Sequence, residues 1–399
     1  MNWQMSFDII RFMKTQVYAD NASTTKLCEE AYSAMLPYLK EDYENPSSTY
    51  SKGVSLRSDI ERIREDLLMK IGGDRYVDSL IFTSGGAEAD SLAVVGYAFA
   101  NKEKGTHIIT SEIEHHAVLN ACKFLEKNGY RVTYVRPSAY GVIDVKDIES
   151  AICEDTILVS VMTINNEIGS IQPIKEIGNL CKEKGVAFHT DAVQAFCKIP
   201  IDVKELNCDM LSVSAHKFHG PKGIGFLYIK KGIEINPLVF GGTQEKGLRG
   251  GTENVPAIIG MAKAAEVSLG NIESSYEKLA LLKAHLFKLL NERLSGFSIN
   301  GDEINGYPGI ANITIDNVEG QSLLISLDMK GVLASTGSAC AIGLDEPSHV
   351  LKAIGRTDDE ARSSLRLSFA ADNTMEDIEY VVDSISKSVE YLRKIRGIC

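Results

Sequence analysis

The sequence predicts an α/β fold with a large, mostly parallel seven-stranded sheet domain and a smaller α+β domain. First, short apolar runs alternate with helical patterns through the first two thirds of the 399 residues, and such alternation is typical of parallel sheets. Second, long helical patterns dominate after about Pro256. We therefore expect a large domain over 17–262 and a small domain over 263–399, with residues 1–26 packed on the small domain or partly disordered.

The strand candidates of the large domain are short apolar runs in which β-branched and aromatic residues are frequent. They are Ser79–Thr83, Thr106–Ile113, Arg131–Val135, Thr156–Met162, Val186–Thr190, Met210–Ser214 and Gly225–Ile229. Between them lie helical patterns such as Ser58–Met69, where Ile60, Ile63 and Leu67 fall on one helical face.

The small domain begins with one long helical pattern that runs from about Pro256 to Leu294 and repeats leucine on one face. Strand candidates follow at Ile310–Ile315 and Ser364–Phe369, and a final helix covers Met375–Ile395. No repeat or proline-rich linker separates the two domains.

Composition excludes several classes of function. The net charge of -12 argues against nucleic acid or an anionic membrane surface as the main partner. No apolar run approaches the roughly 20 residues of a membrane helix, and the N-terminus lacks a signal-peptide pattern, so we expect a cytoplasmic protein. The eight cysteines form no C-x-x-C pair, which predicts neither a structural zinc site nor a disulfide framework.

The turn from Ser84 to Glu88 is glycine-rich, follows a strand and opens a helical pattern. Small residues let the backbone approach an anion, and a helix N-terminus supplies N–H groups and a positive dipole end. Gly86 and Ala87 are therefore candidates for a phosphate site. The alternative is a plain tight turn between strand and helix.

Two later strands also end in polar residues. Asp191 ends one of them, where a carboxylate could pair with a protonated ring nitrogen or merely cap a helix. The other strand leads into Ser214, His216 and Lys217. A lysine there could be a nucleophile with a lowered pKa, and Ser214 and His216 could bind phosphate. The alternative is a solvated lysine.

The three features together predict a pyridoxal 5'-phosphate site. That cofactor needs a phosphate cradle, a carboxylate on its pyridine nitrogen and a lysine that forms a Schiff base. We assign these roles to the Gly86–Ala87 turn, Asp191 and Lys217.

Ten ordered segments carry a resemblance to a known family. The sequence resembles the class V aminotransferase group, and more narrowly the cysteine desulfurases of the NifS/IscS type, from Tyr18 to the C-terminal helix. The segments are YADNASTT, NPSS, FTSGGAEAD, EHHAV, NNEIG, HTDAVQ, SAHKFHGPKG, RGGTEN, STGSAC and LDEPSHVL. The resemblance implies a type I fold of the pyridoxal-phosphate transferases, a homodimer and conversion of L-cysteine to L-alanine. It also implies a sulfur-acceptor protein, such as an iron–sulfur scaffold, or another thiolation pathway.

The resemblance also implies a role for each matching residue. Lys217 would carry the Schiff base, Asp191 would pair with the pyridine nitrogen, and His115 would stack on the ring and shuttle protons. The other cofactor contacts would be Gln194 and Asn166 at the ring hydroxyl, and Gly86, Ala87, Ser214, His216 and the neighbouring subunit's copy of Thr252 at the phosphate. Arg366 would clamp the substrate carboxylate, with Asn45 nearby. The alternative reading of each residue by itself is a structural histidine for His115, a turn residue for Asn166 and a surface ion-pair partner for Arg366.

Cys340 lies in a run of small and polar residues that is typical of an exposed loop. The resemblance makes it the thiol that accepts the substrate sulfur as a persulfide; the alternative is an incidental free thiol. Ala87 stands where threonine is usual in the family, which removes one hydroxyl contact to phosphate. The alternative functions are a selenocysteine lyase or another class V lyase and, outside enzymes, a sulfur-relay scaffold.

Overall fold

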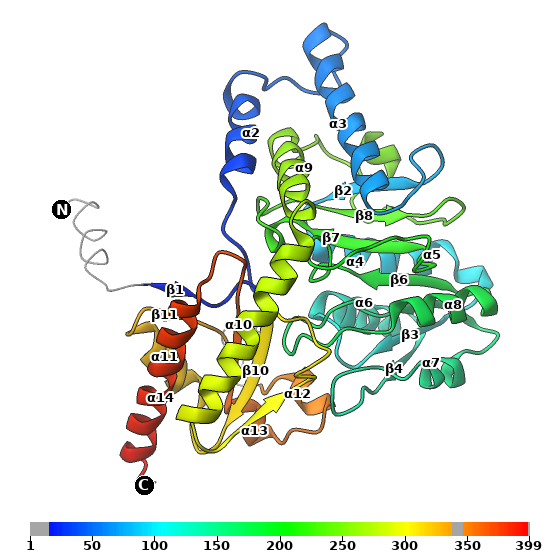
Figure 1. The fold of residues 1–399 in the computed structure, drawn as a ribbon. Helices are drawn as coiled ribbons and strands as arrows, with labels where there is room; N and C mark the ends of the chain where they lie inside the picture. The colour runs from blue at the N-terminus through cyan, green and yellow to red at the C-terminus, as the bar shows by residue number, and fades with distance from the viewer. Residues whose placement is uncertain (1–15, 337–345, 398–399) are drawn as a thin grey trace. The chain divides into compact units, whose positions relative to one another are not determined.

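The computed structural model describes residues 16–336 and 346–397 of the chain, and Figure 1 draws its fold. The described residues form two compact units. The larger unit comprises Thr24–Asn165 and Ser170–Glu273. The smaller unit comprises the described parts of Met1–Ser23, Asn166–Gly169 and Ser274–Cys399.

A seven-stranded sheet forms the centre of the larger unit, with the strand order β2-β8-β7-β6-β5-β3-β4. β8 pairs antiparallel with β2 and β7, whereas the remaining pairs are parallel. This arrangement confirms the predicted mostly parallel sheet. The strands are β2 (Ser79–Thr83), β3 (His107–Ser111), β4 (Arg131–Val135), β5 (Thr156–Ser160), β6 (Ala187–Asp191), β7 (Met210–Ser214) and β8 (Gly225–Ile229).

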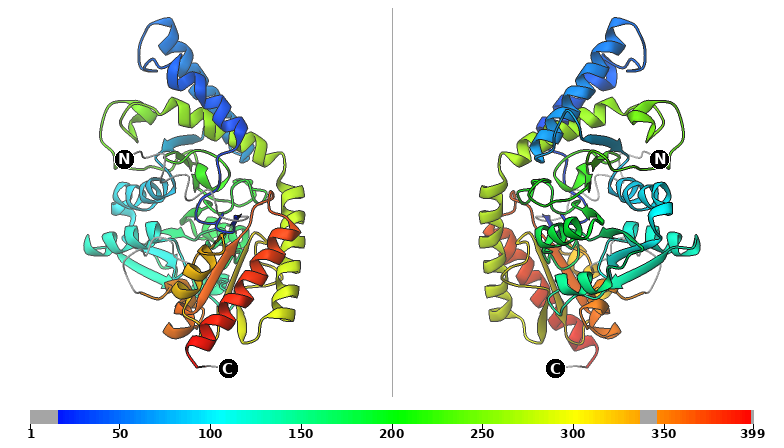
Figure 2. Two further views of the ribbon diagram at one scale, coloured as in Figure 1. Left: turned by 90° about the vertical axis from the view of Figure 1, so that its left-hand side faces the viewer. Right: turned by 90° about the vertical axis from the view of Figure 1, so that its right-hand side faces the viewer.

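Helices cover both faces of this sheet (Figures 1 and 2), so β3, β5, β6 and β7 are buried along their whole length. Two-sided burial is the reason that these strands read as continuous apolar runs. On one face, Ile108 and Leu158 of the strands belong to the same core as Val94 and Val118 of the helices. The helices of this unit are α2 (Glu29–Lys40), α3 (Ser51–Lys70), α4 (Gly86–Ser91), α5 (Tyr97–Ala100), α6 (His116–Lys127), α7 (Val145–Ala151), α8 (Ile174–Lys184) and α9 (Val255–Leu269).

The helix after β2 departs from the regular α-helix predicted for it. Between α4 and α5 the chain makes a π-helical turn over Leu92–Gly96. All five residues of that turn are buried, so packing decides this local geometry, and the periodicity of the sequence does not record it. π-helical turns are frequent near functional sites.

The smaller unit contains a three-stranded antiparallel sheet in the order β12-β10-β9. Helices α10 and α14 lie side by side in this unit (Figure 2), and Arg293 of α10 forms an ion pair with Asp383 of α14 at 2.7 Å. The remaining elements are β1 (Val17–Tyr18), β9 (Phe297–Asn300), β10 (Ile310–Ile315), β11 (Val332–Leu333), β12 (Ser364–Ser368), α10 (Ile272–Arg293), α11 (Gly320–Asp328), α12 (His349–Ala353), α13 (Asp358–Arg362) and α14 (Met375–Ile395).

The single long helix predicted from Pro256 to Leu294 was wrong, because the chain forms two helices there, α9 and α10. α9 ends at Leu269; the N–H of the following residue, Gly270, bonds to Glu266 O, and the Asn271 side chain donates to Val267 O at 2.8 Å. Gly and Asn are the residues that most often end helices. In the described part of the chain, none of the helices is long and apolar enough to span a membrane.

Candidate active site

The carboxyl ends of adjacent strands in the larger unit bring together most of the residues expected to bind the cofactor. Asp191 is the last residue of β6, and its Oδ1 accepts a hydrogen bond from Val193 N at 2.8 Å. Burial raises the pKa of Asp191 to about 6, against the lowering effects of the Val193 N–H and the charge of Lys217. Asp191 is thus a buried acid that interacts electrostatically with Lys217, and such an acid suits a buried cationic partner.

Lys217 ends a short 3-10 helix, Ala215–Lys217, directly after β7. A tight turn fixes this segment: the N–H groups of Phe218 and Gly220 both donate to Ala215 O, at 3.1 and 3.0 Å. A Cβ at Gly220 would lie 2.8 Å from the Ala215 Cβ, so only glycine fits there. The structure therefore holds the half-buried Lys217 beside the strand end that carries Asp191.

The glycine turn after β2 lies against both of these strand ends. A Cβ on Gly86 would come within 2.7 Å of Val193 Cγ2 and 3.5 Å of Ser214 Cβ. Gly85 has φ +146 and lies beside Ser214 Oγ. The turn thus approaches its neighbours more closely than a side chain would allow, and it opens the helix at Gly86.

His216 contributes a neutral ring to this region. Its Nδ1 lies 3.1 Å from Thr24 Oγ1. Burial, followed by the positive charges of Lys217, Lys222 and Lys198, lowers the pKa of His216 to about 4. A turn that only glycine fits, the Ser214 hydroxyl and several lysines suit a dianionic phosphate, so the residues present fit the phosphate of the predicted cofactor.

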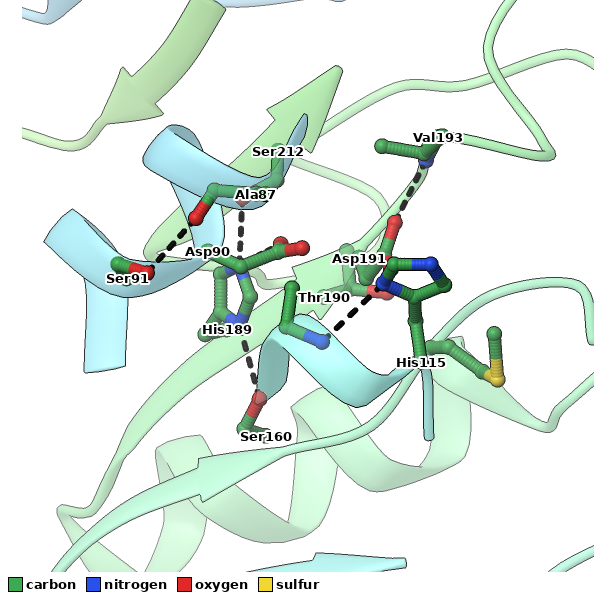
Figure 3. A network of polar contacts seen from close by, with 12 residues as sticks. Ala87, Asp90, Ser91, His115, Ser160, His189, Thr190, Asp191, Val193 and Ser212 are labelled. Atoms are coloured by element: carbon green, nitrogen blue, oxygen red, sulfur yellow. Dashed lines mark hydrogen bonds and ion pairs between the residues drawn. The ribbon is translucent and has the colours of Figure 1, made fainter. Parts of the chain in front are cut away.

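Two further cofactor candidates lie in the same unit. His115 caps α6, and its Nδ1 accepts from Ala117 N at 3.2 Å, so in the neutral ring Nε2 carries the proton. Figure 3 shows His115 and Asp191 beside this edge of the sheet. Gln194 is buried, and its Oε1 accepts from Lys198 Nζ at 2.6 Å.

Arg366 and Asn166 belong to the smaller unit, where they contact each other. Arg366 is 2% exposed on β12, and its Nη1 donates to Asn166 O at 2.9 Å. Its Nη2 contacts Asp20 Oδ1 at 2.8 Å and Ser23 Oγ at 2.6 Å. Within the described residues, Nε of Arg366 is buried without a hydrogen-bond partner, so one guanidinium donor is available to a small anion.

The other expected residues lie at the surface or outside the described chain. Asn45 is exposed before α3, and its Oδ1 accepts from Ser47 N at 2.8 Å. Thr252 is exposed in the segment before α9. Their roles toward substrate and neighbouring subunit stay predictions. Cys340 lies outside the described residues.

Sequence reasoning missed three buried ionisable residues behind Asp191. His189 lies two residues before it on β6, and Asp90 lies on α4. Glu114 precedes His115; its carboxyl bonds to the Ser111 hydroxyl and accepts from Met162 N at 3.0 and 3.1 Å. The alternation of strand residues could have revealed His189, because it shares a face with Asp191. No local pattern marks Asp90 as a neighbour of His189.

Comparison with known proteins places the chain among related sequences over nearly its whole length. The model of the aminotransferase class-V family matches residues 17–381. Over 385 residues, the chain is 47% identical to a cysteine desulfurase IscS of Clostridium botulinum, covering 96% of each chain. Among solved structures, a NifS-like protein gives a TM-score of 0.88 at 34% identity, covering 94% of this chain and 100% of that one. A structure described as SspA in complex with cysteine gives 0.79 at 38% identity, covering 89% and 99%.

Proposed function

The chain belongs to the aminotransferase class-V family and, within it, to the cysteine desulfurases of the NifS/IscS type, and we propose that it converts L-cysteine to L-alanine with Cys340 as the sulfur carrier. The observation that carries this proposal is the acid and lysine pair of Asp191 and Lys217 beside the Gly86 turn. A structure that resembles this chain is described as a complex with cysteine, which supports the choice of substrate.

Pyridoxal 5'-phosphate is the cofactor that these residues fit. When bound, it supplies an electron sink that stabilises negative charge at the substrate carbon. Lys217 would hold it covalently, Asp191 would face its pyridine nitrogen, and Ser214, His216 and the Gly86–Ala87 turn would hold its phosphate. Gln194 and Asn166 would contact the ring hydroxyl.

Two side chains can move the protons of the reaction. Lys217 Nζ, once neutral, can take the proton from the substrate Cα and return one later. His115 Nε2 carries a proton in the tautomer fixed by Ala117 N, so the ring can donate to the substrate near its thiol. Both groups act as positioned acids and bases.

Substrate orientation would rest on Arg366 and Asn45 at the carboxylate. The Cys340 thiolate would attack the substrate sulfur, and the S–S bond would form as the Cβ–S bond breaks. Protonation of Cβ would then give L-alanine. The product on the enzyme is a Cys340 persulfide, and its outer sulfur then passes to an acceptor protein such as an iron–sulfur scaffold. The rate should follow the fraction of Cys340 present as thiolate.

We also propose a homodimer in which each Thr252 reaches the phosphate of the neighbouring subunit. The exposure of Thr252 supports this arrangement. Mixing Thr252→Ala chains with chains that carry Lys217→Ala tests it, because each mixed dimer would then contain one intact site and one site that lacks both residues.

The proposed reaction is tested by measuring sulfide and alanine from L-cysteine in the presence of a thiol reductant. We expect equal amounts of the two products from the wild type, and loss of both from Cys340→Ala. Cys153→Ser is the matched control, because Cys153 is an exposed thiol whose pKa is lowered by Thr156 and Arg131. Full sulfide production by Cys340→Ala would refute the persulfide role. The absence of a bound-cofactor absorbance band in the wild type would refute the cofactor.

A further inference from the structure

His189 links three neighbouring strands of the large sheet by hydrogen bonds, and it lies two residues before the acid Asp191. It is fully buried on β6. Its Nδ1 lies 2.8 Å from Ser160 Oγ of β5, and its Nε2 lies 2.9 Å from Ser212 Oγ of β7 (Figure 3). Because His189 and Asp191 are two residues apart on one strand, their side chains emerge on the same face of the sheet.

Both ring nitrogens of His189 take part in this group. Burial lowers the pKa of His189 to about 3, so the ring is neutral and has one donor and one acceptor nitrogen. Ser212 also lies close enough to the Asp90 carboxyl to lower its pKa. The group thus runs from Ser160 through His189 to Ser212, beside Asp90.

The surroundings of Asp90 favour its uncharged, protonated form. It is 1% exposed, and among the described residues its Oδ1 has no hydrogen-bond partner. The nearest ring nitrogen, Nε2 of His189, lies 3.8 Å away, which is too far for a hydrogen bond. A buried carboxylate that has neither a cation nor a full set of donors is costly. Burial, followed by the charge of Asp191, raises the pKa of Asp90 well above its usual value.

We propose that Asp90, Ser212, His189 and Ser160 form a positioning layer for Asp191, in which His189 fixes the end of β6 to both neighbouring strands and the uncharged Asp90 leaves Asp191 as the charged acid. This inference rests on the proposed function, because Asp191 has to face the cofactor nitrogen. The four residues act through Asp191 and are positioning residues.

The same sheet contains a matched control. His107 is also fully buried, and its ring nitrogens bond to two hydroxyls of neighbouring strands, Thr156 Oγ1 at 2.8 Å and Thr133 Oγ1 at 2.9 Å. His107 begins β3, whereas His189 lies near the carboxyl end of β6. Replacing either histidine should remove two hydrogen bonds to hydroxyls of neighbouring strands, but only His189 lies near Asp191.

The test compares His189→Leu and His107→Leu by three measurements: the thermal midpoint of the apoprotein, the dissociation constant of pyridoxal 5'-phosphate, and the absorbance maximum of the bound cofactor. We expect both variants to lower the thermal midpoint. Only His189→Leu should weaken cofactor affinity, by about tenfold or more, and shift the absorbance maximum. His189→Gln, which keeps one donor and one acceptor, should restore most of the affinity.

Milder variants decide the matter if His189→Leu does not fold. Ser212→Ala should weaken cofactor affinity, whereas Thr133→Ala, its counterpart beside His107, should not. At Asp90, we expect alanine to weaken affinity and the isosteric, uncharged asparagine to restore it. Equal affinities for Asp90→Asn and Asp90→Ala would show that Asp90 does not act as an uncharged acid.

The outcomes separate this inference from the proposed function. If the wild type gives no cofactor absorbance band, the proposed function fails. If the wild type binds the cofactor but the His189 and His107 variants change its affinity and spectrum equally, the positioning layer alone is refuted.

Discussion

Asp20 holds the guanidinium of Arg366, with Nη2 2.8 Å from Oδ1. The pair is largely buried: the side chain of Arg366 is 2% exposed and that of Asp20 is 19% exposed. Ser23 and the Asn166 carbonyl also bond to the guanidinium, so its orientation is set before any substrate arrives. Its charge is meanwhile partly neutralised by an internal carboxylate, and a substrate carboxylate would have to share the guanidinium with it if Arg366 binds substrate as proposed.

The Asp20→Asn variant should therefore separate two effects of Asp20 on Arg366: neutralisation of its charge and orientation of its guanidinium. The amide keeps an acceptor for Nη2 but removes the negative charge, so the KM for L-cysteine should fall several-fold. Stability should fall by about 3 kcal/mol, because a buried Arg loses its counter-charge. Steady-state kinetics and urea unfolding measure the two effects. Asp383→Asn is the control: its ion pair with Arg293 has a similar length, but its side chain is 50% exposed. A raised KM would mean that Asp20 acts mainly by orientation.

Glu114 predicts a pH dependence of the stability of the apoprotein. Burial raises the pKa of Glu114 from its usual 4.5 to about 8, so the folded state holds this proton more tightly than the unfolded state. Its contribution to stability is therefore complete below about pH 4.5 and is lost as the pH rises through about 8. Glu114→Gln removes this loss and can still donate to Ser111 and accept from Met162 N.

This prediction is tested by measuring thermal midpoints from about pH 5 to about pH 9, which covers most of the range over which Glu114 should affect stability. The Glu114→Gln apoprotein should match the wild type at the acid end and exceed it at the alkaline end. The exposed Glu126 of α6 provides the control, since Glu126→Gln should follow the wild type throughout. A constant difference between Glu114→Gln and wild type across the range would contradict the assigned titration.

The sequence predicts the secondary structure of this protein better than the polar contacts of its interior. The bounds of β2, β4, β7 and β10 agree with the prediction because each is an apolar run bounded by polar or small residues. Asp191 and Lys217 were predicted as site residues because ligands bind at the carboxyl ends of parallel strands, and the structure places them at neighbouring strand ends. Asp90 was missed because its neighbour His189 lies 99 positions away in the chain, and only the packing of α4 on the sheet brings them together.

A buried ion pair anchors the segment that leads to Thr252. Arg64 of α3 bonds to both carboxylate oxygens of Glu245, at 2.7 and 2.9 Å, and Phe82 N donates to the same carboxylate at 2.8 Å. Glu245 and Lys246 both have positive φ, of 46 and 58 degrees, which side chains rarely adopt. The ion pair therefore holds a strained turn against β2.

Glu245→Gln should lower the free energy of unfolding by roughly 3–5 kcal/mol, because the buried Arg64 loses its buried partner charge and keeps only the exposed Glu61, at 3.2 Å. The double variant Arg64→Met with Glu245→Leu should recover part of that loss, since neither buried charge remains. Urea unfolding measures both. The exposed pair of Arg62 and Asp59, at 2.8 Å, supplies the control, because Asp59→Asn should change stability by less than about 1 kcal/mol. A similarly small effect of Glu245→Gln would contradict the anchoring role.

Cys153 should be the most reactive thiol of the larger unit. It is exposed, its Sγ lies 3.4 Å from Thr156 Oγ1 and 3.1 Å from Arg131 Nη2, and hydrogen bonds from Thr156 and then Arg131 lower its pKa. Burial instead raises the pKa of Cys122 and Cys181 to about 12. Because the thiolate is the reactive form, iodoacetamide at neutral pH should modify Cys153 before either buried thiol.

Mass spectrometry of timed, quenched samples measures this order of modification. Arg131→Gln should slow the alkylation of Cys153, since it removes a donor and a positive charge from the sulfur. The same change at Arg62, an exposed cation on α3, should leave the rate unchanged. An unchanged rate in Arg131→Gln would mean that exposure alone makes Cys153 reactive.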